Sequence, residues 1–84
     1  MREPDWLKKA KETAEYHRRQ RLLNDTKKWT LNQTAKALRR SVGSVSEDLL
    51  ISRESKVYDL EQFDCQYEAL SFVRMKKKER ELEE

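Results

Sequence analysis

Glycine and proline are almost missing from this chain of 84 residues, which contains one of each, Gly43 and Pro4. Hairpins, β-sandwiches and other strand-rich folds need many turn residues of these two types. Their scarcity therefore predicts long helices joined by short polar links. Charged residues make up 42% of the chain and hydrophobic residues 36%, which is enough for one small core with solvated extensions. We therefore expect one all-α domain over residues 1–84.

Helical periodicity divides the chain into three segments. An N-terminal helix is expected over residues 4–24, with an inward stripe of Trp6, Leu7, Ala10, Thr13, Ala14 and His17. At its far end, Leu22 and Leu23 are expected to anchor it to the core. A helix-turn-helix is expected over residues 30–52. A C-terminal helix with a charged tail is expected over residues 58–84, with the helix running from about Leu60 to beyond Met75.

Two capping signals predict where the helices of the central segment begin. Thr30 and Gln33 have the spacing of a capping box, and Trp29 stands just before it as a hydrophobic staple. Ser41 is a second good N-cap residue. The first of these helices is expected to end at Arg39 or Arg40 and the second near Ser52. The two helices are expected to share a core made by Ala35, Leu38, Val45 and Leu49.

Five positions of the run from Thr30 to Leu50 follow the spacing A-x-x-L-x-x-S-x-x-x-V-x-x-x-L: Ala35, Leu38, Ser41, Val45 and Leu49. This run resembles the helix-turn-helix of bacterial and phage DNA-binding proteins, most closely the version in the ParB/KorB plasmid-partition class. The resemblance covers about a quarter of the chain and implies a DNA-reading module only. The family usually has glycine at the turn, where this chain has Arg39, so we expect a turn of different shape. Gly43, in contrast, falls inside the second helix.

The geometry of such a module assigns roles to individual residues. The start of its second helix enters the major groove, so the candidates for base contacts are Val42, Gly43, Ser44, Ser46 and Glu47. Phosphates would pass the helix starts and the turn, where the candidates are Thr30, Gln33, Lys36, Arg39, Arg40 and Ser41. No base-contact candidate is a strong reader such as arginine. We therefore expect affinity to depend mainly on phosphate contacts, above all by Arg39 and Arg40.

Charge is distributed unevenly along the chain. Residues 1–43 contain 12 Lys/Arg and 5 Asp/Glu, whereas residues 44–84 contain 7 and 11. A basic half attracts a polyanion, although an ordinary solvated helical face has the same composition. Five further cations extend the predicted basic surface, namely Arg18, Arg19, Arg21, Lys27 and Lys28. RNA binding by the basic first helix is a weaker alternative.

Catalysis and metal binding find little support in the sequence. His17 is the only histidine and Cys65 the only cysteine, so we expect no metal site, no cofactor and no enzymatic activity. Cys65 is expected to be a small core residue, and Trp6 and Trp29 are also expected to pack in the core. No run approaches the roughly 18 apolar residues of a membrane span. A single free thiol favours a cytoplasmic location.

The function predicted from these patterns is sequence-specific binding of double-stranded DNA by a small regulator of transcription or partition, of phage, plasmid or bacterial type. The helix of residues 42–51 would lie in the major groove. A homodimer through the C-terminal helix is expected, with Phe63, Tyr67, Leu70 and Val73 as its surface or as the surface that closes the bundle. The alternative is a helical protein-interaction module, an adaptor or inhibitor, that binds a protein partner through the acidic C-terminal half.

Overall fold

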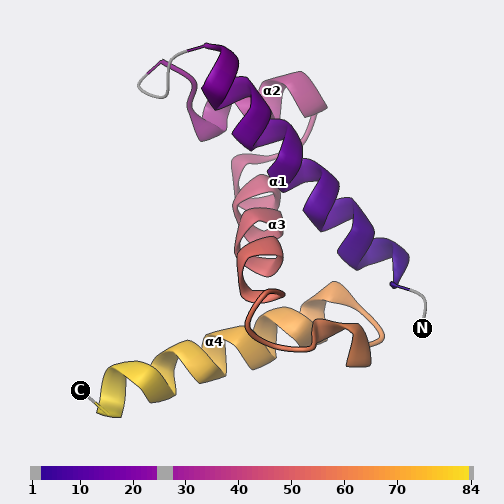
Figure 1. Ribbon diagram of the computed structural model, residues 1–84, viewed down its shortest axis with the longest axis vertical. Helices are drawn as coiled ribbons and strands as arrows, with labels where there is room; N and C mark the ends of the chain where they lie inside the picture. The colour runs from indigo at the N-terminus through magenta and orange to yellow at the C-terminus, as the bar shows by residue number, and fades with distance from the viewer. Residues whose placement is uncertain (1–2, 25–27, 84) are drawn as a thin grey trace.

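The structure, a computed structural model, describes residues 3–24 and 28–83, and this part of the chain contains helices and no strands. The helices are α1 (Asp5–Leu23), α2 (Leu31–Leu38), α3 (Val42–Glu54) and α4 (Gln66–Glu83), with a short 3-10 helix, η1 (Leu60–Gln62), before α4. Figure 1 shows α3 near the centre, α1 crossing it obliquely and α4 lying across its lower end. None of these helices is long and apolar enough to cross a membrane. The predicted all-α class is confirmed.

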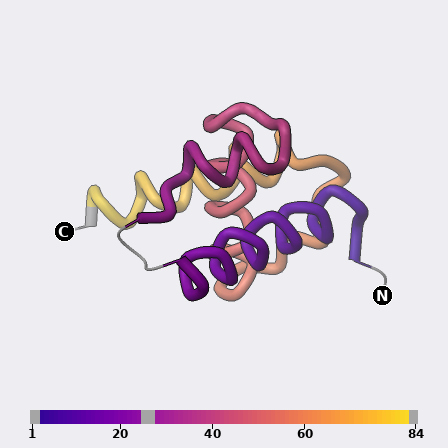
Figure 2. Tube along the Cα trace, turned by 90° about the horizontal axis from the view of Figure 1, so that it is seen from above, coloured from indigo at the N-terminus to yellow at the C-terminus, as the bar shows by residue number. Residues whose placement is uncertain are grey.

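An apolar core fills the space between α1, the lower end of α3 and α4. Its buried members come from four elements and are Leu7, Ala10, Ile51, Leu60, Ala69, Leu70 and Val73. Three aromatic rings pack beside it, where the Phe72 ring lies 5.4 Å from the Tyr58 ring and 5.2 Å from the Phe63 ring. This core fixes the first half of α4 to the body of the protein. The second half of α4 extends past the other helices (Figures 1 and 2).

A second buried region, at the upper end of α3, is largely polar. It contains Thr13 and His17 from α1, Thr34 from α2 and Asp48 from α3, beside the buried apolar side chains of Ala35 and Val45. Figure 2 shows α2 running back in roughly the opposite direction to α1. Because buried polar groups are stable only when hydrogen-bonded, hydrogen bonds contribute, beside this apolar contact, to joining α2 to the rest of the protein.

The helix boundaries differ from the predictions at the C-terminal side. The last helix begins at Gln66 rather than at Leu60. The Asp59 side chain accepts a hydrogen bond from the Glu61 backbone N–H, which starts η1 instead, and Phe63 then takes an extended conformation with φ −91° and ψ 143°. The extended backbone of Phe63 ends η1, so this short helix does not continue into α4. Upstream, α2 already ends at Leu38, and α3 continues to Glu54 instead of ending near Ser52.

Several burial predictions are corrected as well. Leu22 and Leu23 are 68% and 73% exposed and do not anchor the end of α1. Cys65 is exposed rather than a core residue. Trp6 packs against the core as expected, although it is only partly buried, and Trp29 is partly buried outside this core. On α4, Leu70 and Val73 are buried in the chain's own core, whereas Tyr67 is 77% exposed, so the four predicted dimer residues do not form one free surface.

Candidate nucleic-acid interface

Two side-chain caps begin the helices of the α2–α3 unit. The Gln33 backbone N–H donates to Thr30 Oγ1 at 3.4 Å, and the Thr30 backbone N–H donates to Gln33 Oε1 at 2.7 Å. The Ser44 backbone N–H donates to Ser41 Oγ at 3.1 Å. Both predicted helix starts are therefore confirmed. Thr30, Gln33 and Ser41 are exposed, but their side chains are already engaged in capping the N-termini of α2 and α3.

The turn between α2 and α3 is built on a left-handed residue. Arg39 has φ 57° and ψ 46°, and it is the non-glycine residue with positive φ in the described part of the chain. The Arg40 backbone N–H donates to the Ala35 carbonyl at 2.9 Å and closes the end of α2. The expected change of turn shape is therefore wrong: arginine adopts the conformation that glycine adopts more easily. For a residue with a Cβ this conformation costs about 1 kcal/mol.

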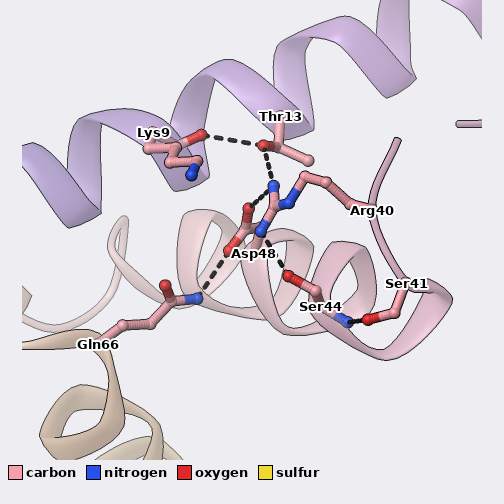
Figure 3. A network of polar contacts seen from close by, with 7 residues as sticks. All are labelled: Lys9, Thr13, Arg40, Ser41, Ser44, Asp48 and Gln66. Carbon is pink, nitrogen blue, oxygen red and sulfur yellow. Dashed lines mark hydrogen bonds and ion pairs between the residues drawn. The ribbon is translucent and has the colours of Figure 1, made fainter. Parts of the chain in front are cut away.

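The next side chain, Arg40, points into the protein (Figure 3). Its Nη1 donates to Thr13 Oγ1 at 2.9 Å and to Asp48 Oδ2 at 2.5 Å, and its Nη2 donates to Ser44 Oγ at 2.5 Å. The Asp48 side chain is 2% exposed, and its other oxygen accepts from Gln66 Nε2 at 2.7 Å. One ion pair therefore connects α1, α3 and the start of α4 at the turn.

This network changes the role of Arg40. Sequence reasoning placed Arg40 among the phosphate contacts, but its side chain is only 20% exposed and its guanidinium is already bound by three side chains. We therefore assign it to positioning the start of α3. Ser44 accepts from Arg40 and is half-buried, so it too belongs more to the network than to the free surface.

Arg39 and Lys36 lie on the outside of the same turn. Both side chains are exposed, and no hydrogen bond or ion pair within residues 3–24 and 28–83 engages their charged groups. They line one shallow hollow whose other residues are Asn32, Ala35, Arg40, Ser41 and Val42. This hollow holds two free cations next to the capped start of α3.

The first two turns of α3 present a small, nearly uncharged surface beside this hollow. Val42 is 40% exposed, Gly43 and Ser46 are exposed, and Glu47 is half-buried. A Cβ atom on Gly43 would meet nothing within 4 Å, and Gly43 does not have positive φ. Nothing inside the protein therefore requires glycine at this position.

The predicted basic surface on α1 is partly neutralised. Glu15 Oε1 lies 2.8 Å from Arg18 Nη2 and 3.4 Å from Arg19 Nη2. The hydrogen bond from Arg18 lowers the pKa of the exposed Glu15 carboxyl, and Glu15 in turn raises the pKa of Arg18. Arg21 and Lys28 are exposed. Lys27 lies outside the described residues.

A hydrogen-bonded chain of three side chains connects α1 to the start of α2. Trp29 Nε1 donates to Thr34 Oγ1 at 2.7 Å, and Thr34 Oγ1 lies 2.6 Å from His17 Nδ1. Since indole nitrogen only donates, Thr34 accepts from Trp29, and its own hydroxyl proton is free to donate to an unprotonated His17 Nδ1. Burial, with a smaller contribution from Arg21, lowers the pKa of His17. The arrangement therefore favours neutral His17.

Stability is expected to fall when the pH is lowered through the titration of His17. The pKa of His17 is lower in the folded chain than its ordinary value of 6.5, so the unfolded chain binds the proton more readily. The contribution of neutral His17 is complete above pH 6.5 and is lost as the pH falls from there through the lower folded pKa. Urea denaturation at pH 7.5, 6.5 and 5.5 measures this loss. The variant His17→Gln is the control, and an equal loss in that variant would contradict the assignment.

Comparisons with known proteins add no independent information about this interface. No protein-family model, no curated protein and no solved structure matches the chain. Within residues 3–24 and 28–83, no group of three or more His, Cys, Asp or Glu side chains is placed to hold a metal ion. The resemblance to the ParB/KorB class stays a prediction.

Proposed function

We propose that this chain is a sequence-specific double-stranded DNA-binding protein, in which the first half of α3 enters the major groove. One observation carries the proposal: the free cations Lys36 and Arg39 border the exposed first turns of α3. An exposed helix face of small side chains fits a groove of about 12 Å width, and cations at its border suit the phosphates of the groove wall.

Base readout is expected to be modest on this surface. Val42 suits contact with a thymine methyl group, Ser46 accepts or donates to several bases, and Glu47 suits the amino group of cytosine. None of these makes the bidentate contact that discriminates most strongly between bases. Affinity therefore depends mainly on phosphate contacts, and a regulator of transcription or partition built on this module would gain specificity from two half-sites in a dimer.

Salt dependence is the direct test of this proposal. A DNA target is first selected from a random duplex pool, and its dissociation constant is then measured by fluorescence anisotropy between 50 and 300 mM salt. Binding by Lys36, Arg39 and neighbouring cations predicts a log–log slope of about −0.9 for each phosphate contacted. Undetectable binding at 50 mM salt, or affinity that does not change with salt, would contradict the proposal.

Gly43 offers a second test, because alanine at this position is expected to stabilise the free protein but to weaken a complex in which DNA lies close to α3. Gly43→Ala is expected to raise the free energy of unfolding by about 0.5–1 kcal/mol, since alanine favours helix and the added Cβ has open space. If the DNA backbone approaches α3 closely here, the same variant binds the selected duplex more weakly. Ser71→Ala, at an exposed helical position on α4 that is assigned no DNA contact, is the control. A Gly43→Ala variant that is more stable and binds equally well would exclude a close approach.

A protein-interaction module is the second candidate, and the outer side of α4 favours it. Tyr67, Met75 and Leu82 are 77%, 50% and 77% exposed, and their spacing of eight and seven residues places them on one side of the helix. Two double variants separate the candidates, Lys36→Ala/Arg39→Ala and Tyr67→Ser/Met75→Ser. If only the first variant loses the biological activity of the protein in the cell, DNA binding is supported. If only the second variant loses that activity, binding of a protein partner is supported. A pair that includes Arg40 is unsuitable because it also breaks the network at the turn.

A further inference from the structure

We propose a second phosphate-binding site at the other end of α3, where Arg53, Lys77 and Arg80 surround the buried carboxylate of Glu54. The inference rests on the proposed function, because the ligand is a backbone phosphate of the same DNA duplex, beyond the base pairs that α3 contacts. The site lies where the second half of α4 passes the end of α3 (Figure 1).

Glu54 brings together two arginines from different helices. Its side chain is 8% exposed, and its Oε1 lies 3.4 Å from Arg80 Nη2 on α4 and 4.0 Å from Arg53 Nε on α3. A carboxylate buried to this extent needs such partners, because an unpaired buried charge is costly. Glu54 therefore binds Arg80 by a hydrogen bond and has the Arg53 guanidinium beside it, so the two guanidinium groups lie near each other at the surface.

Within the part of the chain that the structure describes, most of the donors on these arginines have no other partner. A guanidinium carries five N–H groups, and each contact with Glu54 uses one nitrogen. The Arg53 and Arg80 side chains are 70% and 52% exposed. Lys77 lines the same hollow, together with Val57 and Glu81. Two oriented guanidinium groups and an ammonium suit the several oxygens of one phosphate.

The position of Arg53 also fits a helix lying in the major groove. Arg53 follows Ser46 by seven residues, which places both exposed side chains on the same side of α3. The separation along the helix axis is about 10 Å, from a rise of about 1.5 Å per residue. Because the major groove is about 12 Å wide, a base contact at Ser46 and a phosphate contact at Arg53 are compatible in one complex.

The test compares two double variants with the same change of charge. Arg53→Gln/Arg80→Gln removes the two arginines, and Lys8→Gln/Lys78→Gln is the control, since Lys78 lies on the opposite side of α4 from Arg80. The first is expected to bind the selected duplex roughly threefold to fivefold more weakly at 150 mM salt, with a salt slope shallower by about one. The control is expected to show smaller changes in both affinity and salt slope.

The length of the duplex gives an independent measurement. Removing base pairs from the flank next to the site should weaken binding by the wild-type chain but not by Arg53→Gln/Arg80→Gln. Lys77→Gln is tested as well, because Lys77 is exposed and its loss leaves the Glu54 contacts in place. Circular dichroism confirms that each variant is folded.

The outcomes separate this inference from the proposed function. If the wild-type chain binds no duplex, the proposed function fails. In a second outcome, the wild-type chain binds duplex with a salt slope that Lys36→Ala/Arg39→Ala reduces. If neither Lys77→Gln nor Arg53→Gln/Arg80→Gln then changes the affinity, the salt slope or the dependence of affinity on duplex length, only the second site is overturned.

Discussion

Replacing Asp48 by alanine is expected to lower the free energy of unfolding by about 3 kcal/mol, because it leaves a mostly buried guanidinium without its carboxylate. One oxygen of Asp48 accepts from Arg40 and the other from Gln66, so the variant loses contacts to two elements together. For the 84-residue chain, total stability is expected to be roughly 4–12 kcal/mol. The loss is therefore a large fraction of the total. Urea denaturation at pH 7, followed by circular dichroism, measures it.

Asp64→Ala is the matched control for this prediction. Asp64 is exposed and its side chain has no hydrogen bond or ion pair within residues 3–24 and 28–83, so the change is expected to stay within about 0.5 kcal/mol. The double variant Arg40→Leu/Asp48→Leu should be less destabilised than the sum of its single variants, by about 1 kcal/mol or more. Additive losses would show that the pair is not coupled in the way the network indicates.

The features that the sequence predicted well are those decided within a few residues. The caps at Thr30 and Ser41 each need only a hydroxyl and a backbone N–H three residues later. The helical class follows from the near absence of glycine and proline. The inward positions of Ala35 and Val45 follow from helical spacing together with their size. None of these depends on where a distant part of the chain lies.

Arg40 and Asp48 show why the candidate site was harder to predict. Arg39 and Arg40 are neighbours with the same side chain, but the left-handed backbone at Arg39 sends one outward and the other inward. Thr13, which accepts from Arg40, and Gln66, which donates to Asp48, lie 27 and 26 residues from Arg40 along the chain. One local signal was available, since Asp48 falls three residues from both Val45 and Ile51 on the inward side of the helix.

The predicted start of the last helix is wrong for a related reason. Leu60, Phe63 and Tyr67 continue the helical spacing, so periodicity alone extends the helix back to Leu60. In the structure, Asp59 caps a separate short turn, and Phe63 packs its ring against Phe72 from an extended backbone. Aromatic packing outweighs a weak local preference here. Tyr67 is then left exposed on α4, whereas Leu70 and Val73 are buried.

Arg39→Gly is expected to make the protein more stable and to make it bind DNA less tightly. Glycine removes the left-handed strain at the turn and should raise the free energy of unfolding by about 1 kcal/mol. The same change removes a free cation beside the start of α3, so affinity for the selected duplex should fall roughly fivefold to tenfold at 150 mM salt, with a salt slope shallower by about one. Denaturation and anisotropy titration of the same preparation measure both effects.

Arg39→Ala separates the two causes, because it removes the charge but keeps a Cβ in the left-handed conformation. It should lose the same affinity as Arg39→Gly without the gain in stability, so the two variants differ by about 1 kcal/mol in unfolding and bind DNA alike. Equal stability of the two would show that Arg39 carries no strain. Undiminished DNA binding by both would remove Arg39 from the proposed interface. An arginine in a position that favours glycine is thus the point where the demands of folding and of the proposed binding are expected to oppose each other.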